Sequence, residues 1–148
     1  MLWNLFLKTI KVNFRVKYEF IPGTLKQDQI DLDRKIGNQV DAKFEFVLDI
    51  LDLLEQLLLF QKQIFRTFDR SGSSATNSGQ NRLTPCVPVI LDTQELYSMC
   101  VKFLSILHNE LPSEPLSGFR ERFMKSRIKI CYALGFKNFC QSVWKPWA

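Results

Sequence analysis

Residues 40–68 read VDAKFEFVLDILDLLEQLLLFQKQIFRTF, a stretch that contains no glycine and no proline. Its apolar residues recur at intervals of three, four and seven, the spacing of one helical face. They are Val40, Phe44, Val47, Leu51, Leu54, Leu58, Phe65 and Phe68. An acidic stripe opposes them, at Asp41, Glu45, Asp49 and Asp52. Leucines crowded between positions 51 and 59 widen the apolar arc, so the pattern predicts a long helix covered on two sides.

The segment that precedes this helix predicts a second, basic helix over residues 3–16. Its apolar contacts are expected from Leu5, Ile10, Val12 and Val16. Basic residues occupy another face, at Lys8, Lys11 and Arg15, and Lys17 follows them.

The first residues lack the basic leader and the small-residue cleavage site of a signal peptide. The four acids between positions 44 and 60 exclude a membrane span there.

Turn-forming residues divide the rest of the chain into further helices. Pro22-Gly23 marks a turn, and residues 24–39 read as a connection with one short helical turn at 27–35. Residues 70–81 form a polar segment that predicts a mobile linker. A helix is expected over 85–109 with Thr84 as its N-cap, and another over 119–133. No alternating run bounded by turns indicates a strand, so the fold class predicted for these 148 residues is all-α, an antiparallel helical stack.

Charge is distributed unevenly along the chain, whose net charge is +5. Residues 1–37 carry seven basic and four acidic side chains, whereas residues 38–69 carry three basic and six acidic ones. Residues 116–148 carry seven basic side chains and one acidic one. The basic ends are compatible with a solvated surface balanced by the acidic helix, or with attraction to anionic lipid.

The residues that catalysis or metal binding would need are sparse. The single histidine, His108, lies near the end of a predicted helix without a second ligand at a useful spacing, which favours a packing or capping role. The acidic stripe lacks the Glu-x-x-His partner of a di-metal site and reads as solvated. Cys86 and Cys100 read as small core residues. No phosphate-binding loop or nucleophile motif occurs, so we expect no catalytic residue, no metal, no cofactor and no nucleic acid partner.

Two stretches resemble a known family. The first is KVNFRVK at 11–17 followed by FIPGTL at 20–25, and the second extends from SGQNRLTP at 78–85 through VILD at 89–92 to LSGFRERF at 116–123. Together they resemble the later part of the ANTH domain of the huntingtin-interacting-protein family and its actin-linking relatives. The likeness covers residues 6–126, so residues 1–126 are expected to form a partial ANTH-like domain. Residues 127–148 are expected to be a divergent, partly helical tail.

The resemblance implies an α-solenoid fragment of a cytoplasmic endocytic adaptor, peripheral at clathrin-coated membrane. The implied partners are anionic, phosphoinositide-containing membrane and, through regions outside this chain, the endocytic coat and actin machinery. The family's main lipid site has no counterpart in this chain, so membrane contact is expected only through the residual basic face of Lys8, Lys11, Arg15 and Lys17. The alternative for this face is a solvated helix edge. The alternative is a purely protein-binding helical scaffold. An amino-terminally truncated solenoid would also expose an apolar face, for which Phe6, Leu7 and the leucines of positions 51–59 are candidates.

Overall fold

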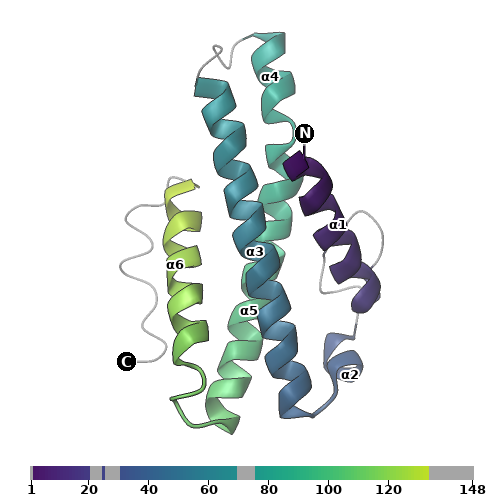
Figure 1. Ribbon diagram of the computed structural model, residues 1–148, viewed down its shortest axis with the longest axis vertical. Helices are drawn as coiled ribbons and strands as arrows, with labels where there is room; N and C mark the ends of the chain where they lie inside the picture. The colour runs from purple at the N-terminus through teal and green to yellow at the C-terminus, as the bar shows by residue number, and fades with distance from the viewer. Residues whose placement is uncertain (1, 21–24, 26–30, 70–75, 134–148) are drawn as a thin grey trace.

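The computed structural model describes residues 2–20, 25, 31–69 and 76–133 (Figure 1). In chain order its helices are α1 (Leu2–Lys17), α2 (Leu32–Ile36), α3 (Val40–Asp69), α4 (Asn77–Leu83), α5 (Cys86–Glu110) and α6 (Ser117–Ala133). The described residues contain no strand. The all-α class and the antiparallel stack predicted from the sequence are therefore confirmed.

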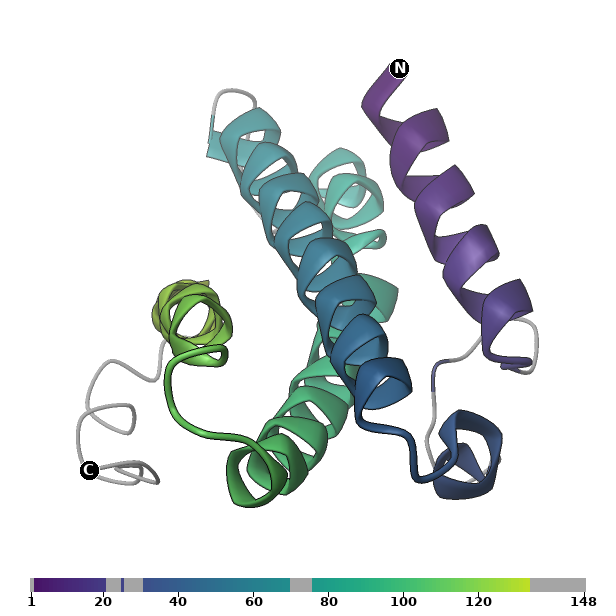
Figure 2. The same ribbon diagram turned by 60° about the horizontal axis from the view of Figure 1, so that its bottom comes forward.

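The long helix α3 is the centre of the fold, and it contacts every other helix. Helix α5 runs antiparallel to α3 along most of its length, while α1 and α6 flank the pair on opposite sides (Figure 1). With the bottom of the molecule turned toward the viewer, α1 stands at the edge of the bundle (Figure 2). The wide apolar arc of α3 is thus covered from several directions, as the crowding of its leucines predicts.

An aromatic cluster joins α1, α3 and α5 in the core. The fully buried ring of Phe46 on α3 lies 4.7 Å from the ring of Tyr18 and 4.8 Å from that of Phe103, both in edge-on arrangements. The Phe14 ring of α1 stacks 6.0 Å from the same ring. Edge-on and offset rings are the favoured geometries of aromatic pairs, so this cluster fixes where α1 docks on the central pair.

Helix α1 ends before the predicted Pro22-Gly23 turn, through a Schellman-type cap. The Phe20 N–H donates to the Arg15 carbonyl at 2.9 Å, and the Glu19 N–H donates to the Val16 carbonyl at 3.3 Å. This cap needs one residue in the left-handed region, and Glu19 takes that role with φ of 58°. The position usually belongs to glycine, so sequence inspection overlooks a glutamate there.

The polar segment predicted as a linker over 70–81 contains the start of α4, while residues 70–75 lie outside the described set. The Thr76 hydroxyl accepts a hydrogen bond from the Gly79 N–H at 3.1 Å and caps this helix. The predicted N-cap role of Thr84 is wrong. Its hydroxyl instead donates to the Gln80 carbonyl at 3.0 Å at the end of α4, and Pro85 precedes α5 without a side-chain cap.

The expectation that the leucines of positions 51–59 are exposed is also wrong for most of them. Leu51, Leu53, Leu54, Leu57 and Leu58 are all buried, because α1, α5 and α6 surround this part of α3. Only Leu59 of this group is exposed, at 40%. The side chains of Phe6 and Leu7, the other candidates, lie outside those that the structure describes.

The predicted division between a domain ending at residue 126 and a tail is not marked by a break in the helix. Helix α6 continues through that point to Ala133, and Ser126 and Arg127 are both buried. The rest of the predicted tail, residues 134–148, lies outside the described part of the chain.

Candidate membrane-facing surface on α1

Helix α1 has one face packed on the core and one face in solvent. Phe14 and Tyr18 are buried, and Ile10 is partly buried against the same cluster. The spacing of these residues, four positions apart, places them on one side of the helix. Residues at the complementary positions must then point outward.

Lys11 lies on the inner side of α1 and is engaged within the fold. Its ammonium group donates to the carboxylate of Asp92 on α5, forming an ion pair between residues 81 positions apart. The Asp92 side chain is only 7% exposed and that of Lys11 22%. A buried carboxylate requires such a partner, so Lys11 serves the α1–α5 contact.

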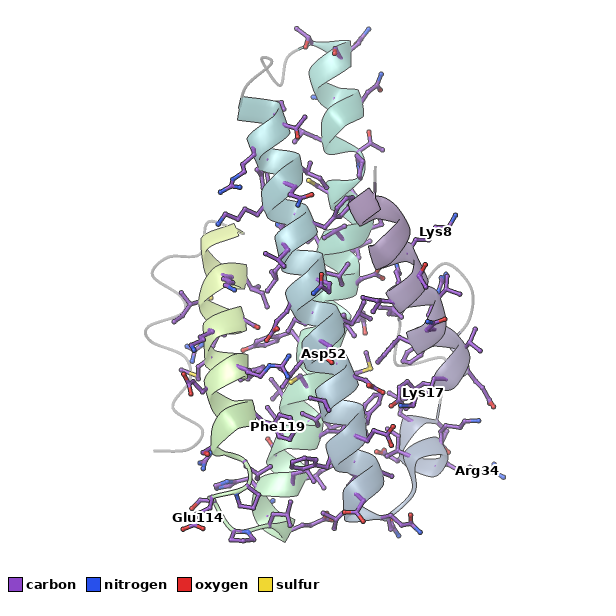
Figure 3. All side chains as sticks on the ribbon, viewed as in Figure 1. Lys8, Lys17, Arg34, Asp52, Glu114 and Phe119 are labelled. Atoms are coloured by element: carbon purple, nitrogen blue, oxygen red, sulfur yellow. The ribbon has the colours of Figure 1, made fainter. Side chains whose placement is uncertain are left out.

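Lys17 is engaged by two acids of α3. Its ammonium group lies 2.6 Å from Asp49 and 2.7 Å from Glu45, and the Tyr18 hydroxyl donates to the same Asp49 at 2.6 Å. The hydrogen bonds with Asp49 and Glu45 raise the pKa of Lys17 above its ordinary value. Burial and the hydrogen bond to Asp49 likewise raise the pKa of Tyr18. Figure 3 shows Lys17 between α1 and α3.

Lys8 and Arg15 differ from these two lysines, because neither forms an ion pair with another residue that the structure describes. Lys8 is exposed and points away from the bundle (Figure 3). Arg15 lies two turns further along α1 and is half-buried. The structure therefore separates the four predicted contact residues into an inner pair, Lys11 and Lys17, and an outer pair, Lys8 and Arg15.

Two valines share the outer face with Lys8 and Arg15. Val16 is 72% exposed and Val12 37%, which corrects the expectation that both supply apolar contacts to the core. Positions 8, 12, 15 and 16 follow helical spacing, and α1 contains no acidic residue. We call Lys8, Val12, Arg15 and Val16 the outer surface of α1. Once the fold shows that Phe14 and Tyr18 are buried, the helical register places both valines on the opposite side of α1.

The acidic stripe of α3 faces solvent, as the sequence predicts, since Asp41, Glu45 and Asp52 are exposed and Asp49 is half-buried. Three of these acids also form ion pairs. Glu45 and Asp49 hold Lys17 of α1, while Asp52 lies 2.6 Å from Arg122 of α6. Arg122 also contacts Glu55 at 2.9 Å. One lysine of α1 and one arginine of α6 thus pair with acids of the central helix.

The other candidate groups offer no reaction centre in the parts of the chain that the structure describes. No group of His, Cys, Asp and Glu with metal-binding geometry occurs among those residues. His108 lies in the last turn of α5, and Cys86 and Cys100 are buried as the sequence predicts. Burial raises the pKa of the Cys100 thiol to about 12, so it is protonated at neutral pH. None of the described helices combines the length and hydropathy needed to cross a bilayer.

Comparison with known proteins agrees with the family resemblance. The family model described as the ANTH domain matches residues 3–130. Human Huntingtin-interacting protein 1 is 38% identical over 133 residues, covering 87% of this chain and 13% of that protein. Huntington interacting protein related 1 of Caenorhabditis elegans is 32% identical over 114 residues, covering 76% and 12%.

A third relative is more distant. Endocytosis protein end4 of Schizosaccharomyces pombe is 24% identical over 126 residues, covering 83% of this chain and 11% of that protein. The chain therefore spans between 11% and 13% of the length of these three relatives. Because the ANTH model and the more similar relatives cover most of the 148 residues, this chain belongs to the ANTH domain family.

Proposed function

We propose that this chain is a non-catalytic adaptor module that attaches to anionic membrane through the outer surface of α1. The observation that carries the proposal is the combination of Lys8 and Arg15 with exposed Val12 and Val16 on a helix without acids. A basic side chain near an anionic bilayer gains about 1 kcal/mol. Apolar side chains on the same face strengthen binding by entering the headgroup layer.

Membership of the ANTH family extends the proposal to a cellular process. The Schizosaccharomyces pombe relative is named an endocytosis protein, and we propose that this chain also acts in endocytosis, in the cytoplasm at clathrin-coated membrane. Phosphoinositides are the proposed lipid class. Contacts with coat and actin machinery would be made by other regions of a longer protein, since this chain matches a small part of its relatives.

Vesicle co-sedimentation tests the proposed surface. The chain is mixed with phosphatidylcholine vesicles that contain no anionic lipid, phosphatidylserine or a phosphoinositide, and the bound fraction is measured for each. The test variant combines Lys8→Glu with Arg15→Glu. The matched control combines Lys62→Glu with Arg66→Glu, which makes the same change in net charge at two exposed basic residues of α3.

We expect anionic vesicles to bind the wild-type chain and the control, and the Lys8→Glu/Arg15→Glu variant to bind at least roughly 30-fold more weakly. That factor corresponds to losing two favourable contributions of about 1 kcal/mol each. A phosphoinositide preference appears as stronger binding than to phosphatidylserine at equal surface charge. Equal weakening of both charge-reversal variants would mean that net charge alone attracts the chain, and would refute a site on α1.

A purely protein-binding scaffold is the second candidate function. The observation that favours it is a second exposed apolar pair, Val87 at 60% and Leu91 at 58%, one turn apart on α5. On this hypothesis coat or actin-associated proteins bind without membrane. Such binding should be lost in a Val87→Lys/Leu91→Lys variant and kept in the Lys8→Glu/Arg15→Glu variant.

A further inference from the structure

The inner face of α1 has the composition of a helix that binds to a membrane surface. It presents Ile10, Phe14 and Tyr18 together with Lys11 and Lys17, and the helix has no acid of its own. A basic amphipathic helix of this composition is the typical element that lies in the headgroup layer of an anionic bilayer. In the fold, carboxylates of α3 and α5 pair with these lysines, as lipid phosphates would on such a bilayer.

The ion pairs that hold α1 differ in how accessible they are to a competing lipid headgroup. Lys17 is 45% exposed and its partner Glu45 63% exposed, so a headgroup can approach this pair from solvent. The Lys11–Asp92 pair is far more enclosed. Exposed ion pairs are individually weak, because water and salt screen them. The Lys17 end of α1 is therefore the end at which lipid phosphates would first displace the acids.

The position of α1 in the fold also makes its release feasible. The helix stands at the edge of the bundle and packs mainly on α3, with the Lys11–Asp92 pair reaching α5 (Figure 2). Its departure would leave the contacts of α3 with α5 and α6 in place. Elements with few contacts to the rest of a protein are the ones that open most readily, and α1 lies at the edge of this bundle.

We propose that Glu45 and Asp49 restrain membrane binding by holding Lys17, and that an anionic bilayer displaces them and receives the inner face of α1. This inference rests on the proposed function, because it concerns the same helix and the same class of lipid. It adds regulation to that function: the fold's own acids compete with lipid, and Lys11 and Lys17 become lipid contacts only after release.

Removal of the restraining charges provides the first test. The test variant combines Glu45→Gln with Asp49→Asn. The matched control combines Asp52→Asn with Glu55→Gln, which removes two acids from the same helix where they hold Arg122 of α6. Both variants gain the same net charge. Binding to phosphatidylcholine vesicles that contain phosphatidylserine is compared with binding to phosphatidylcholine alone.

We expect the Glu45→Gln/Asp49→Asn variant to bind the anionic vesicles roughly fivefold more tightly than the control, the gain from one released lysine. Equal binding by the two variants would refute the restraint while leaving the proposed function intact. If neither the wild-type chain nor any variant binds anionic vesicles, both the inference and the proposed function fail.

A depth measurement provides an independent readout of release. In a background with Trp3, Trp144 and Trp147 replaced by Phe, a single tryptophan is introduced as Phe14→Trp on the inner face or Val16→Trp on the outer face. Vesicles that carry bromine on their acyl chains quench only an inserted tryptophan. Quenching of both positions supports release of α1, whereas quenching at position 16 alone refutes it. If Phe14→Trp disturbs folding, Ile10→Trp, at a partly buried position, reports on the same face.

Discussion

Replacement of Lys11 by methionine should lower the free energy of unfolding by about 3–4 kcal/mol at pH 7. The change leaves the Asp92 carboxylate, only 7% exposed, without the ammonium group that neutralises it. Stranding one member of a buried ion pair typically costs about 3–5 kcal/mol.

The opposite replacement should cost much less. In an Asp92→Asn variant the side chain keeps its shape, and Lys11, at 22% exposure, can turn its ammonium group toward water. We expect a loss of about 1 kcal/mol, the net value of an ordinary hydrogen bond. A Lys11→Met/Asp92→Leu double variant should lose less than Lys11→Met alone, because no charge is then stranded.

Urea unfolding followed by circular dichroism measures these differences, provided that the slopes of the transitions agree among the variants. Equal losses for Lys11→Met and Asp92→Asn would refute the assignment of this pair as the buried anchor of α1.

Four further predictions concern the core, a helix cap and two titrating groups. Phe46→Ala should cost about 3–5 kcal/mol in urea unfolding, since its ring is fully buried against three others, and a loss below about 1 kcal/mol would contradict the cluster. Glu19→Gly should stabilise the fold by about 0.5–1 kcal/mol, because φ is 58° there, and thermal unfolding at a lower temperature would count against the cap. Because the pKa of Tyr18 is raised, the stability that its hydroxyl contributes is present below pH of about 10 and is lost as the pH rises further. Tyr18→Phe should therefore reduce the fall in the free energy of unfolding at alkaline pH. Tyrosinate absorbance follows the titration. Cys100, whose pKa burial raises to about 12, should resist alkylation at mildly alkaline pH until the chain unfolds, and rapid labelling detected by mass spectrometry would contradict its burial.

The helices with strong periodicity are the part of the fold that sequence reasoning predicts well. Helix α3 begins at the predicted Val40, and α5 and α6 begin within two residues of their predicted starts. Their apolar spacing reflects burial, which determines both the pattern and the structure. The errors arise where one local interaction decides the outcome. Thr76 caps a helix in a polar segment, and Thr84 bonds backward to Gln80.

The candidate surface was less accessible to sequence reasoning, because its composition depends on partners far along the chain. The spacing of Lys8, Lys11, Arg15 and Lys17 shows that they share a helix, but their roles are decided by the acids that face them. Asp92 lies 81 positions after Lys11, and Asp49 lies 32 positions after Lys17. One-dimensional periodicity carries no information about such pairs. The prediction that Val12 and Val16 contact the core is wrong because the direction of the core is known only from the burial of Phe14 and Tyr18 in the fold.

The long separation between Lys11 and Asp92 has a consequence for the newborn chain. A ribosome adds about 5–20 residues per second, so it makes Asp92 roughly 4–16 s after Lys11. During that interval a basic, apolar segment has emerged without the carboxylate that later encloses its charge. The segment is open to chaperones and to any polyanion nearby, the ribosome's own RNA included.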